Sequence, residues 1–206
     1  MAGLNAVVDL SHFNNVESFD TVKASGIAGV IHKATQGTGY IDSQYAARKP
    51  LALQAGLMWG AYHFGTGDDG VQQAEHFLSV VQPGPNDLMV LDFENNPSGT
   101  TMSVQQAEQF IQTIQAQTGR LPGFYSSNYF VKQNNITSQS IISQCWFWLA
   151  LYGNDPSVPP PFNIWTLWQY TDGNAGPDPH SVNGIGNCDR DQFNGSLDNL
   201  KKLWGY

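Results

Sequence analysis

The sequence has few charged residues, only two cysteines and no long apolar run. Asp, Glu, Lys and Arg make up 13% of its 206 residues, which is about half their usual share in globular proteins. Lys and Arg number 9 against 17 Asp and Glu, so the net charge is −8. Nucleic-acid binding requires clustered basic residues, and an anionic membrane attracts the same charges. We therefore expect no nucleic-acid partner and no stable membrane anchoring.

A transmembrane helix needs about 18 or more consecutive apolar residues, and the sequence contains no such run. The segment from Met1 to Asp9 lacks the basic start and the long apolar region of a secretion signal. The two cysteines, Cys145 and Cys188, could form one disulfide or remain two buried thiols. We favour thiols, because no secretion signal indicates an oxidising compartment.

Strand-like and helix-like segments alternate over the first two thirds of the chain, which is typical of a parallel sheet with connecting helices. The last third has strands without obvious helices, so eight strand candidates predict a closed, irregular, TIM-like α/β barrel. With 41% hydrophobic residues and no internal repeat, residues 1–206 are expected to form a single domain. The predicted strands are 6–10, 27–35, 57–64, 88–94, 123–126, 145–152, 164–170 and 188–193; the predicted helices are 19–25, 42–55 with a break at Lys49 before Pro50, 70–81 and 103–118; residues 171–187 are expected to be a glycine-rich loop.

The most informative stretch runs from Leu88 to Glu94 and reads LMVLDFE. Its four apolar residues suit a buried strand. Side chains two positions apart on a strand point to the same face, with Cα atoms roughly 6.5–7 Å apart. Asp92 and Glu94 therefore project together, and Phe93 faces away. Because active sites in barrels of parallel strands lie where strands end and loops begin, we predict an active site around these two carboxylates.

Two further acids and several aromatic residues fall at the same level of the predicted barrel. Asp9 lies near the end of the first strand, and Asp189 lies on the last strand. Acids ringed by aromatic side chains suit glycoside hydrolysis, in which one carboxylic acid protonates the leaving oxygen. Most aromatic residues at such positions nevertheless belong to the core. The aromatic candidates are Tyr62, Phe64, Tyr125, Trp148, Tyr152, Trp168 and Tyr170.

Three histidines allow a different interpretation. His12, His32 and His63 could bind a metal ion together with Asp9 and Asp92, as in a metal-dependent hydrolase or deacetylase. However, the sequence contains neither an HxH nor an HExxH spacing, and His63 faces away from its two aromatic neighbours on the same strand. We therefore expect no metal site and no cofactor.

Seven short motifs follow one another along the chain: Asp9-Leu-Ser11, His32-Lys-Ala-Thr-Gln-Gly37, Gly60-Ala-Tyr-His-Phe64, Asp92-Phe-Glu94, Trp148-Leu-Ala-Leu-Tyr152, Trp168-Gln-Tyr170 and Asp189-Arg-Asp-Gln-Phe193. In this order they resemble glycoside hydrolase family 25, the Chalaropsis-type lysozymes or N-acetylmuramidases. The resemblance spans nearly the whole chain, from Asp9 to Gly195. One departure is Gln36, which stands where the family usually has an acid.

The resemblance implies a barrel of five β/α units followed by three strands. It also implies hydrolysis of the β-1,4 bond between N-acetylmuramic acid and N-acetylglucosamine in peptidoglycan, by a retaining, substrate-assisted mechanism. Glu94 would be the general acid, and Asp92 would orient or stabilise the substrate's 2-acetamido group. Asp9 and Asp189 would complete an acidic floor. The candidates for sugar contacts are Tyr62, Phe64, Tyr125, Trp148, Gln169 and Tyr170.

Two other functions stay open. One is a cell-wall binding protein without turnover, against which the intact Asp92 and Glu94 argue, and the other is a metal-dependent polysaccharide deacetylase. We expect a monomer whose partner is the glycan strand of peptidoglycan, with no separate wall-binding module. It would act outside the cytoplasm on the bacterial cell wall, whether secreted, injected or released by a phage.

Overall fold

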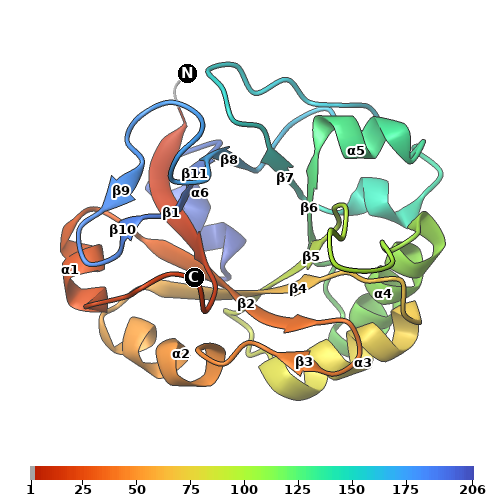
Figure 1. Cartoon of the computed structure of the whole chain (residues 1–206), viewed down its shortest axis with the longest axis horizontal. Coiled ribbons are helices and arrows are strands. Elements are labelled where there is room, and N and C mark those ends of the chain that lie inside the picture. The colour runs from red at the N-terminus through yellow and green to blue at the C-terminus, as the bar shows by residue number, and fades with distance from the viewer. Residues whose placement is uncertain (1–2) are drawn as a thin grey trace.

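The computed structural model describes residues 3–206, which form a barrel of eight strands with helices on its outside (Figure 1). Going round the barrel, the strand order is β1-β11-β8-β7-β6-β5-β4-β2, and pairing of β1 with β2 closes the ring. Neighbouring strands are parallel except at β11, which runs antiparallel to both β1 and β8. The predicted irregular barrel is confirmed. Its strands are β1 (Leu4–Leu10), β2 (Gly29–Gln36), β4 (Met58–Phe64), β5 (Leu88–Asp92), β6 (Gly123–Ser127), β7 (Phe147–Ala150), β8 (Leu167–Thr171) and β11 (Asp189–Phe193).

The first five barrel strands are each followed by a helix that leads to the next barrel strand, as the resemblance implied, whereas no helix connects β7 to β8 or β8 to β11 within the described residues. The five helices are α1 (Phe19–Ala24), α2 (Tyr45–Gln54), α3 (Gly70–Val81), α4 (Val104–Thr118) and α5 (Asn128–Gln133). Smaller elements complete the chain: β3 (Tyr40–Ile41), the 3-10 helix η1 (Ile141–Gln144), the hairpin β9 (Ser181–Val182) and β10 (Gly186–Asn187), and α6 (Leu197–Leu203).

Local sequence signals explain where the best-defined helix begins and ends. Ser103 accepts a hydrogen bond from the Gln106 backbone N–H, and the Gln106 side chain accepts one from the Ser103 N–H at 2.8 Å, which is a capping box. At the other end Gly119 adopts a φ of 72°, a left-handed conformation that glycine accepts without a steric penalty. The predicted break before Pro50 was wrong, because α2 continues through it. Tyr45, Arg48 and Ala52 are buried on both sides of Pro50, so tertiary packing offsets the hydrogen bond that the proline removes.

The barrel wall separates two apolar cores. Side chains of one phase along each strand fill the barrel interior, among them Val7, Ile31 and Val90. Side chains of the other phase, such as Val8 and Leu91, pack between the strands and the outer helices. This alternation follows from the two-residue period of a strand, and it decides which polar side chains can reach the inner cavity.

Helix α6, which was not predicted, closes one end of the barrel and lies behind β1 in Figure 1. Its Leu200 and the adjoining Trp204 are fully buried and join the inner core. The Trp204 indole N–H donates a hydrogen bond to the Trp59 carbonyl at 2.9 Å. A Cβ at Gly29 would lie 3.2 Å from the Trp204 ring, so this glycine makes room for the indole. Leu200 and Trp204 therefore fill this end of the barrel, opposite the end where the parallel strands finish.

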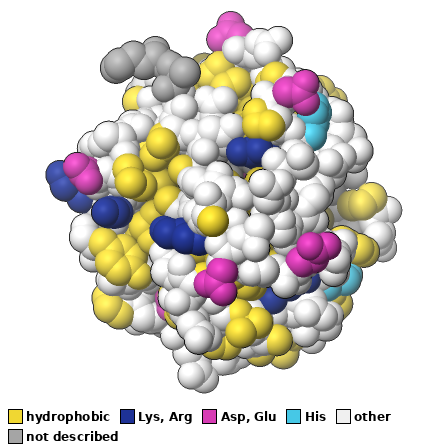
Figure 2. Space-filling view, turned by 90° about the vertical axis from the view of Figure 1, so that its left-hand side faces the viewer, with side chains coloured by type: hydrophobic (Ala, Val, Ile, Leu, Met, Phe, Trp, Pro, Cys, Tyr) yellow, Lys and Arg dark blue, Asp and Glu magenta, His cyan; other side chains and the backbone are white. Residues whose placement is uncertain are grey.

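The segment predicted as a glycine-rich loop holds the β9–β10 hairpin, which packs beside α1. The Glu17 backbone N–H donates to the Gly184 carbonyl at 2.8 Å. Figure 2 shows this side of the molecule, where charged side chains are few and scattered among polar and apolar surface. Cys145 and Cys188 are both buried and free, as expected. No helix within residues 3–206 is long and apolar enough to cross a membrane.

Candidate active site

The four predicted acids meet at the open end of the barrel, around a cavity of about 190 Å³. Asp9 and Asp92 lie at the ends of β1 and β5, and Glu94 follows two positions later. Asp189 begins β11 and pairs with Asp9 across the ladder. Because β11 is antiparallel to its neighbours, its first residue lies at the level where the other strands end. The cavity is lined by Asp9, Tyr62, Asp92, Glu94, Tyr125, Trp148, Tyr152, Gln169 and Asp189.

Gln169 links three sides of this cavity. Its side-chain N–H donates to Asp9 Oδ2 at 2.8 Å. Its carbonyl oxygen accepts from the Tyr125 hydroxyl at 2.8 Å and from the Tyr152 hydroxyl at 3.0 Å. One buried amide on β8 therefore fixes a carboxylate and two phenols from three other parts of the barrel. The sequence named Tyr152 as an aromatic candidate but did not assign it a sugar contact.

Below this layer lies Asp191, an acid to which the sequence assigned no role. It is fully buried and accepts a hydrogen bond from the Trp148 indole N–H at 2.7 Å. Its second oxygen, Oδ2, has no donor within the described residues. Asp191 follows Asp189 by two positions on β11, so both face the barrel interior. The same period-two rule that paired Asp92 with Glu94 could have identified it.

The surroundings of the acids raise their pKa values. Burial raises the pKa of Asp9, Asp92 and Glu94, and nearby carboxylates raise the pKa of Asp9 and Asp92 further. Burial also raises the pKa of Asp191, and it raises that of Asp189 to about 6. A carboxyl group in a poorly solvated, negatively charged cavity keeps its proton to higher pH. The site thus contains proton donors suited to working near neutral pH.

We expect the Asp191→Asn protein to gain stability relative to wild type as the pH rises from 4 to 7. A carboxyl group whose pKa is raised in the folded state binds its proton more tightly in the folded protein than in the unfolded chain. It therefore contributes to the free energy of unfolding at low pH, and this contribution is lost as the pH rises above the pKa of the unfolded chain, near 4. Asparagine does not titrate, and its carbonyl can still accept from Trp148. The measurement is the free energy of unfolding in urea for both proteins across this range.

The difference between the two proteins is the informative quantity. His32 and His63 have pKa values lowered by burial to about 4 and about 3, so they make both proteins more stable as pH rises. This contribution is the same in both proteins and cancels. A difference in unfolding free energy that does not change with pH would contradict the assignment of Asp191 as a buried acid that costs energy to ionise.

Two of the predicted sugar-contact residues lie outside the cavity. Tyr170 is adjacent to Gln169 on β8, so the two side chains face opposite sides of the wall. Tyr170 is buried in the outer core, and its hydroxyl donates to the Pro179 carbonyl at 3.0 Å; its predicted place in the cavity was wrong. Phe64 instead lines a neighbouring groove of about 650 Å³, which also reaches Glu94.

The histidines of the metal-site alternative are not gathered around the acids. His32 and His63 lie on the outer side of the wall, where His32 stacks on Trp59 and His63 stacks on Phe110. The His63 ring is hydrogen-bonded on both sides, by Thr35 at 2.8 Å and Gln73 at 3.0 Å. These two side chains are therefore structural, and they cannot reach Asp9 or Asp92.

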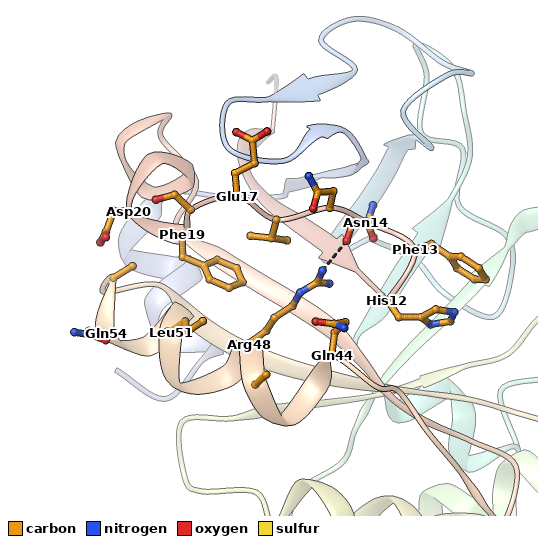
Figure 3. A pocket seen from close by; sticks show the side chains of 15 residues that line it. His12, Phe13, Asn14, Glu17, Phe19, Asp20, Gln44, Arg48, Leu51 and Gln54 are labelled. Atoms are coloured by element: carbon orange, nitrogen blue, oxygen red, sulfur yellow. Dashed lines mark hydrogen bonds between the residues drawn. The ribbon is translucent and has the colours of Figure 1, made fainter.

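A separate cavity of about 750 Å³ lies between α2 and the loop that follows β1 (Figure 3). Arg48 reaches across its inner side and donates to the Asn14 carbonyl at 2.6 Å and the Ser11 carbonyl at 2.8 Å. None of the four acids lines this cavity. Its arginine is engaged by backbone carbonyls, so its role is to hold the loop.

Comparison with known proteins agrees with this arrangement. Residues 8–178 match the family described as Glycosyl hydrolases family 25. The chain is 32% identical to Lysozyme M1 of Streptomyces globisporus, over 95% of its own length and 70% of that protein. It is 27% identical to the N,O-diacetylmuramidase of Chalaropsis sp, over 95% and 96% of the two chains. The solved structure of the bacterial lysozyme from Streptomyces coelicolor has a TM-score of 0.86 and 30% identity, over 98% of this chain and 97% of that one. The chain therefore belongs to family 25 of the glycosyl hydrolases and is a glycoside hydrolase.

Proposed function

We propose that the protein is an N-acetylmuramidase, which hydrolyses the β-1,4 bond between N-acetylmuramic acid and N-acetylglucosamine in peptidoglycan. The observation that carries this proposal is the placement of Asp92 and Glu94 on one wall of the cavity, two positions apart at the end of β5. Retaining glycosidases with a protein nucleophile hold two carboxylates across the sugar, about 5–5.5 Å apart. A pair on one wall instead suits a reaction in which the substrate supplies its own nucleophile.

In this mechanism Glu94 donates its proton to the glycosidic oxygen as the bond to the anomeric carbon breaks. The oxygen of the 2-acetamido group attacks that carbon, and Asp92 accepts a hydrogen bond from the acetamido N–H. Asp92 lines the cavity, so its carboxyl group faces the position where the acetamido group would lie. Glu94 then takes a proton from the water that opens the intermediate, so the product retains its configuration.

The remaining groups support the same reaction. Asp9 and Asp189 place carboxyl oxygens where the transition state develops positive charge. Tyr62, Tyr125 and Trp148 line the cavity as candidate sugar contacts. The relatives named as lysozymes and muramidases support peptidoglycan as the partner, and the protein would then act on the bacterial wall outside the cytoplasm, as a monomer.

The test is mass spectrometry of purified peptidoglycan after digestion and reduction with borohydride. We expect fragments whose reduced end is N-acetylmuramic acid, because the cut releases the anomeric carbon of that sugar. Fragments reduced at glucosamine would place the cut at the other glycosidic bond. Intact strands that have only lost acetyl groups would instead indicate a deacetylase, and intact strands retained by the protein would indicate a binding function.

A further inference from the structure

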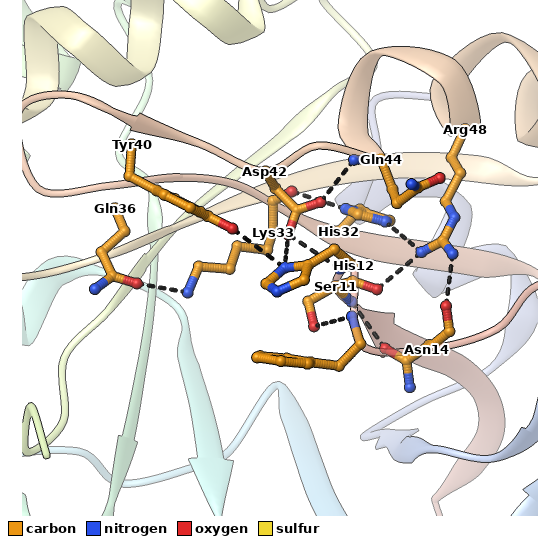
Figure 4. Close-up of polar contacts among 11 residues, drawn as sticks. Ser11, His12, Asn14, His32, Lys33, Gln36, Tyr40, Asp42, Gln44 and Arg48 are labelled. Carbon is orange, nitrogen blue, oxygen red and sulfur yellow. Dashed lines mark hydrogen bonds and ion pairs between the residues drawn. The ribbon is translucent and has the colours of Figure 1, made fainter. Parts of the chain in front are cut away.

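The cation Lys33 lines the groove that Glu94 also lines, and its hydrogen-bond partner is uncharged. The Lys33 ammonium on β2 donates a hydrogen bond to the Gln36 side-chain carbonyl at 2.7 Å (Figure 4). No carboxylate within residues 3–206 lies within ion-pair distance of it. Its other near neighbours are the rings of Phe64 and Tyr40, whose centroids are 4.9 and 5.7 Å from Nζ. The hydrogen bond therefore fixes the ammonium without neutralising it.

The acid on the outer side of Lys33 is already occupied. Asp42 accepts from the His12 ring at 2.8 Å, the His12 backbone N–H at 3.0 Å and the Gln44 backbone N–H at 3.0 Å. Figure 4 shows these contacts converging on Asp42 from one side, while the Lys33 chain extends toward Gln36. The charge of Lys33 is thus not cancelled by a direct pair with Asp42.

On its inner side Lys33 shares a groove with Glu94, and the ammonium opposes the effect of burial on the pKa of Glu94 and Asp92. The other charged or titratable groups around Glu94 come from every side of the barrel. In the cavity they are Asp92 on β5, Asp9 on β1, Asp189 on β11, Tyr62 on β4, Tyr125 on β6 and Tyr152 after β7. The groove that Glu94 shares with Lys33 adds His12 after β1, Tyr40 on β3 and Asp68 after β4. Among these neighbours Lys33 is the only lysine or arginine, and His12 is paired with Asp42 at 2.8 Å. Charge interactions in a partly dehydrated groove are much stronger than in water.

We propose that Gln36 acts as a positioning residue that sets the acid strength of Glu94, because its neutral amide holds Lys33 in place while leaving the ammonium's charge directed at the acid. This inference rests on the proposed function only in naming Glu94 as the proton donor. A carboxylate at position 36 would hold the same ammonium but cancel its charge.

The test compares Gln36→Glu with wild type in the pH dependence of kcat/KM on peptidoglycan. A neutralised Lys33 stabilises the Glu94 carboxylate less, so Glu94 keeps its proton to higher pH. We expect the alkaline limb of the profile to move up by about 0.5–1 pH unit, a typical size for one nearby charge. The matched control is Gln72→Glu, the same change on the exposed face of α3, which should leave the limb in place.

Two further variants separate charge from shape. Gln36→Met keeps the length of the side chain but loses the hydrogen bond to Lys33. It should not move the alkaline limb of the pH profile to higher pH. Repeating Gln36→Glu in a Lys33→Met background should give a much smaller shift than in wild type, because no cation remains to be neutralised. An undiminished shift would mean that the new carboxylate acts on Glu94 directly, and it would overturn the proposal, as would an unmoved limb in Gln36→Glu.

A readout without turnover keeps this test independent of the proposed function. The ¹³C signal of the Glu94 carboxyl, assigned by its loss in Glu94→Gln, can be titrated in wild type and Gln36→Glu. Its midpoint should rise in the variant by the same amount as the kinetic limb. If wild type does not cleave peptidoglycan but the midpoint rises, the proposed function fails and the role of Gln36 stands. If the midpoint is unchanged, the role of Gln36 fails whatever the activity.

Discussion

Replacing Glu94 by Gln is expected to lower kcat/KM on peptidoglycan by about 10²–10⁴-fold, the usual contribution of a positioned general acid. The amide has nearly the shape of the carboxyl group but cannot donate an acidic proton to the glycosidic oxygen. Stability should change little or rise slightly, because burial already disfavours the ionised form of Glu94. Reducing-sugar release and urea unfolding of the same preparation measure both effects.

The matched control is Glu75→Gln, the same change on the exposed surface of α3. It should leave kcat/KM within about twofold of wild type, because surface substitutions away from a site rarely matter. Residual activity of the Glu94→Gln protein should also lose the alkaline limb of its pH profile, since the group responsible is gone. A folded Glu94→Gln protein with wild-type turnover would remove Glu94 from the mechanism.

Replacing Trp204 by Ala is expected to lower the free energy of unfolding by about 3–5 kcal/mol, as for other buried large-to-small changes. Trp204 is 1% exposed and plugs the closed end of the barrel, so its loss opens a cavity against Gly29 and leaves the Trp59 carbonyl without its donor. Because domains of this kind are stable by only about 5–15 kcal/mol, the variant should unfold at markedly lower urea concentration.

Two control variants test whether the loss of stability comes from the buried Trp204 side chain. Leu197 is the first residue of α6, and its side chain is 43% exposed. Leu197→Ala should therefore lower the free energy of unfolding by less than about 1 kcal/mol. Trp204→Phe retains most of the apolar volume and loses the hydrogen bond, so it should cost an intermediate amount. If the stability of Trp204→Ala lay within 1 kcal/mol of wild type, α6 would not be a structural plug.

The sequence predicted best those features that depend on a local pattern. The capping box at Ser103 and the glycine at position 119 fixed the limits of α4 to within one residue. The period of two along β5 placed Asp92 and Glu94 together. The same period along Trp168-Gln-Tyr170 excludes Gln169 and Tyr170 from one cavity, so the prediction that both contact sugar there contradicts the strand geometry.

Other features depend on contacts between distant parts of the chain, and no local pattern carries them. Pro50 is an ordinary helix breaker, and only the packing of α2 against the barrel keeps that helix continuous. Helix α6 is short, and its burial is evident only once Trp204 is seen to meet Gly29 and Trp59. The bond between Lys33 and Gln36 could not be predicted either, because side chains three positions apart on a regular strand point to opposite faces, and β2 has a register shift between Lys33 and Thr35.

The pairing of β11 with β1 affects how this enzyme folds during its synthesis. Asp9 and Gln169, which bond across the cavity, are 160 positions apart, and β11 must pair with β1 before the ring closes. During synthesis on the ribosome, β1 therefore waits with one edge unpaired until the last strand emerges, and exposed edges invite wrong pairing. Asp189 also arrives only then. A chain that lacks β11 can neither close its barrel nor bring Asp189 to the other acids, so hydrolytic activity requires that β11 has been made.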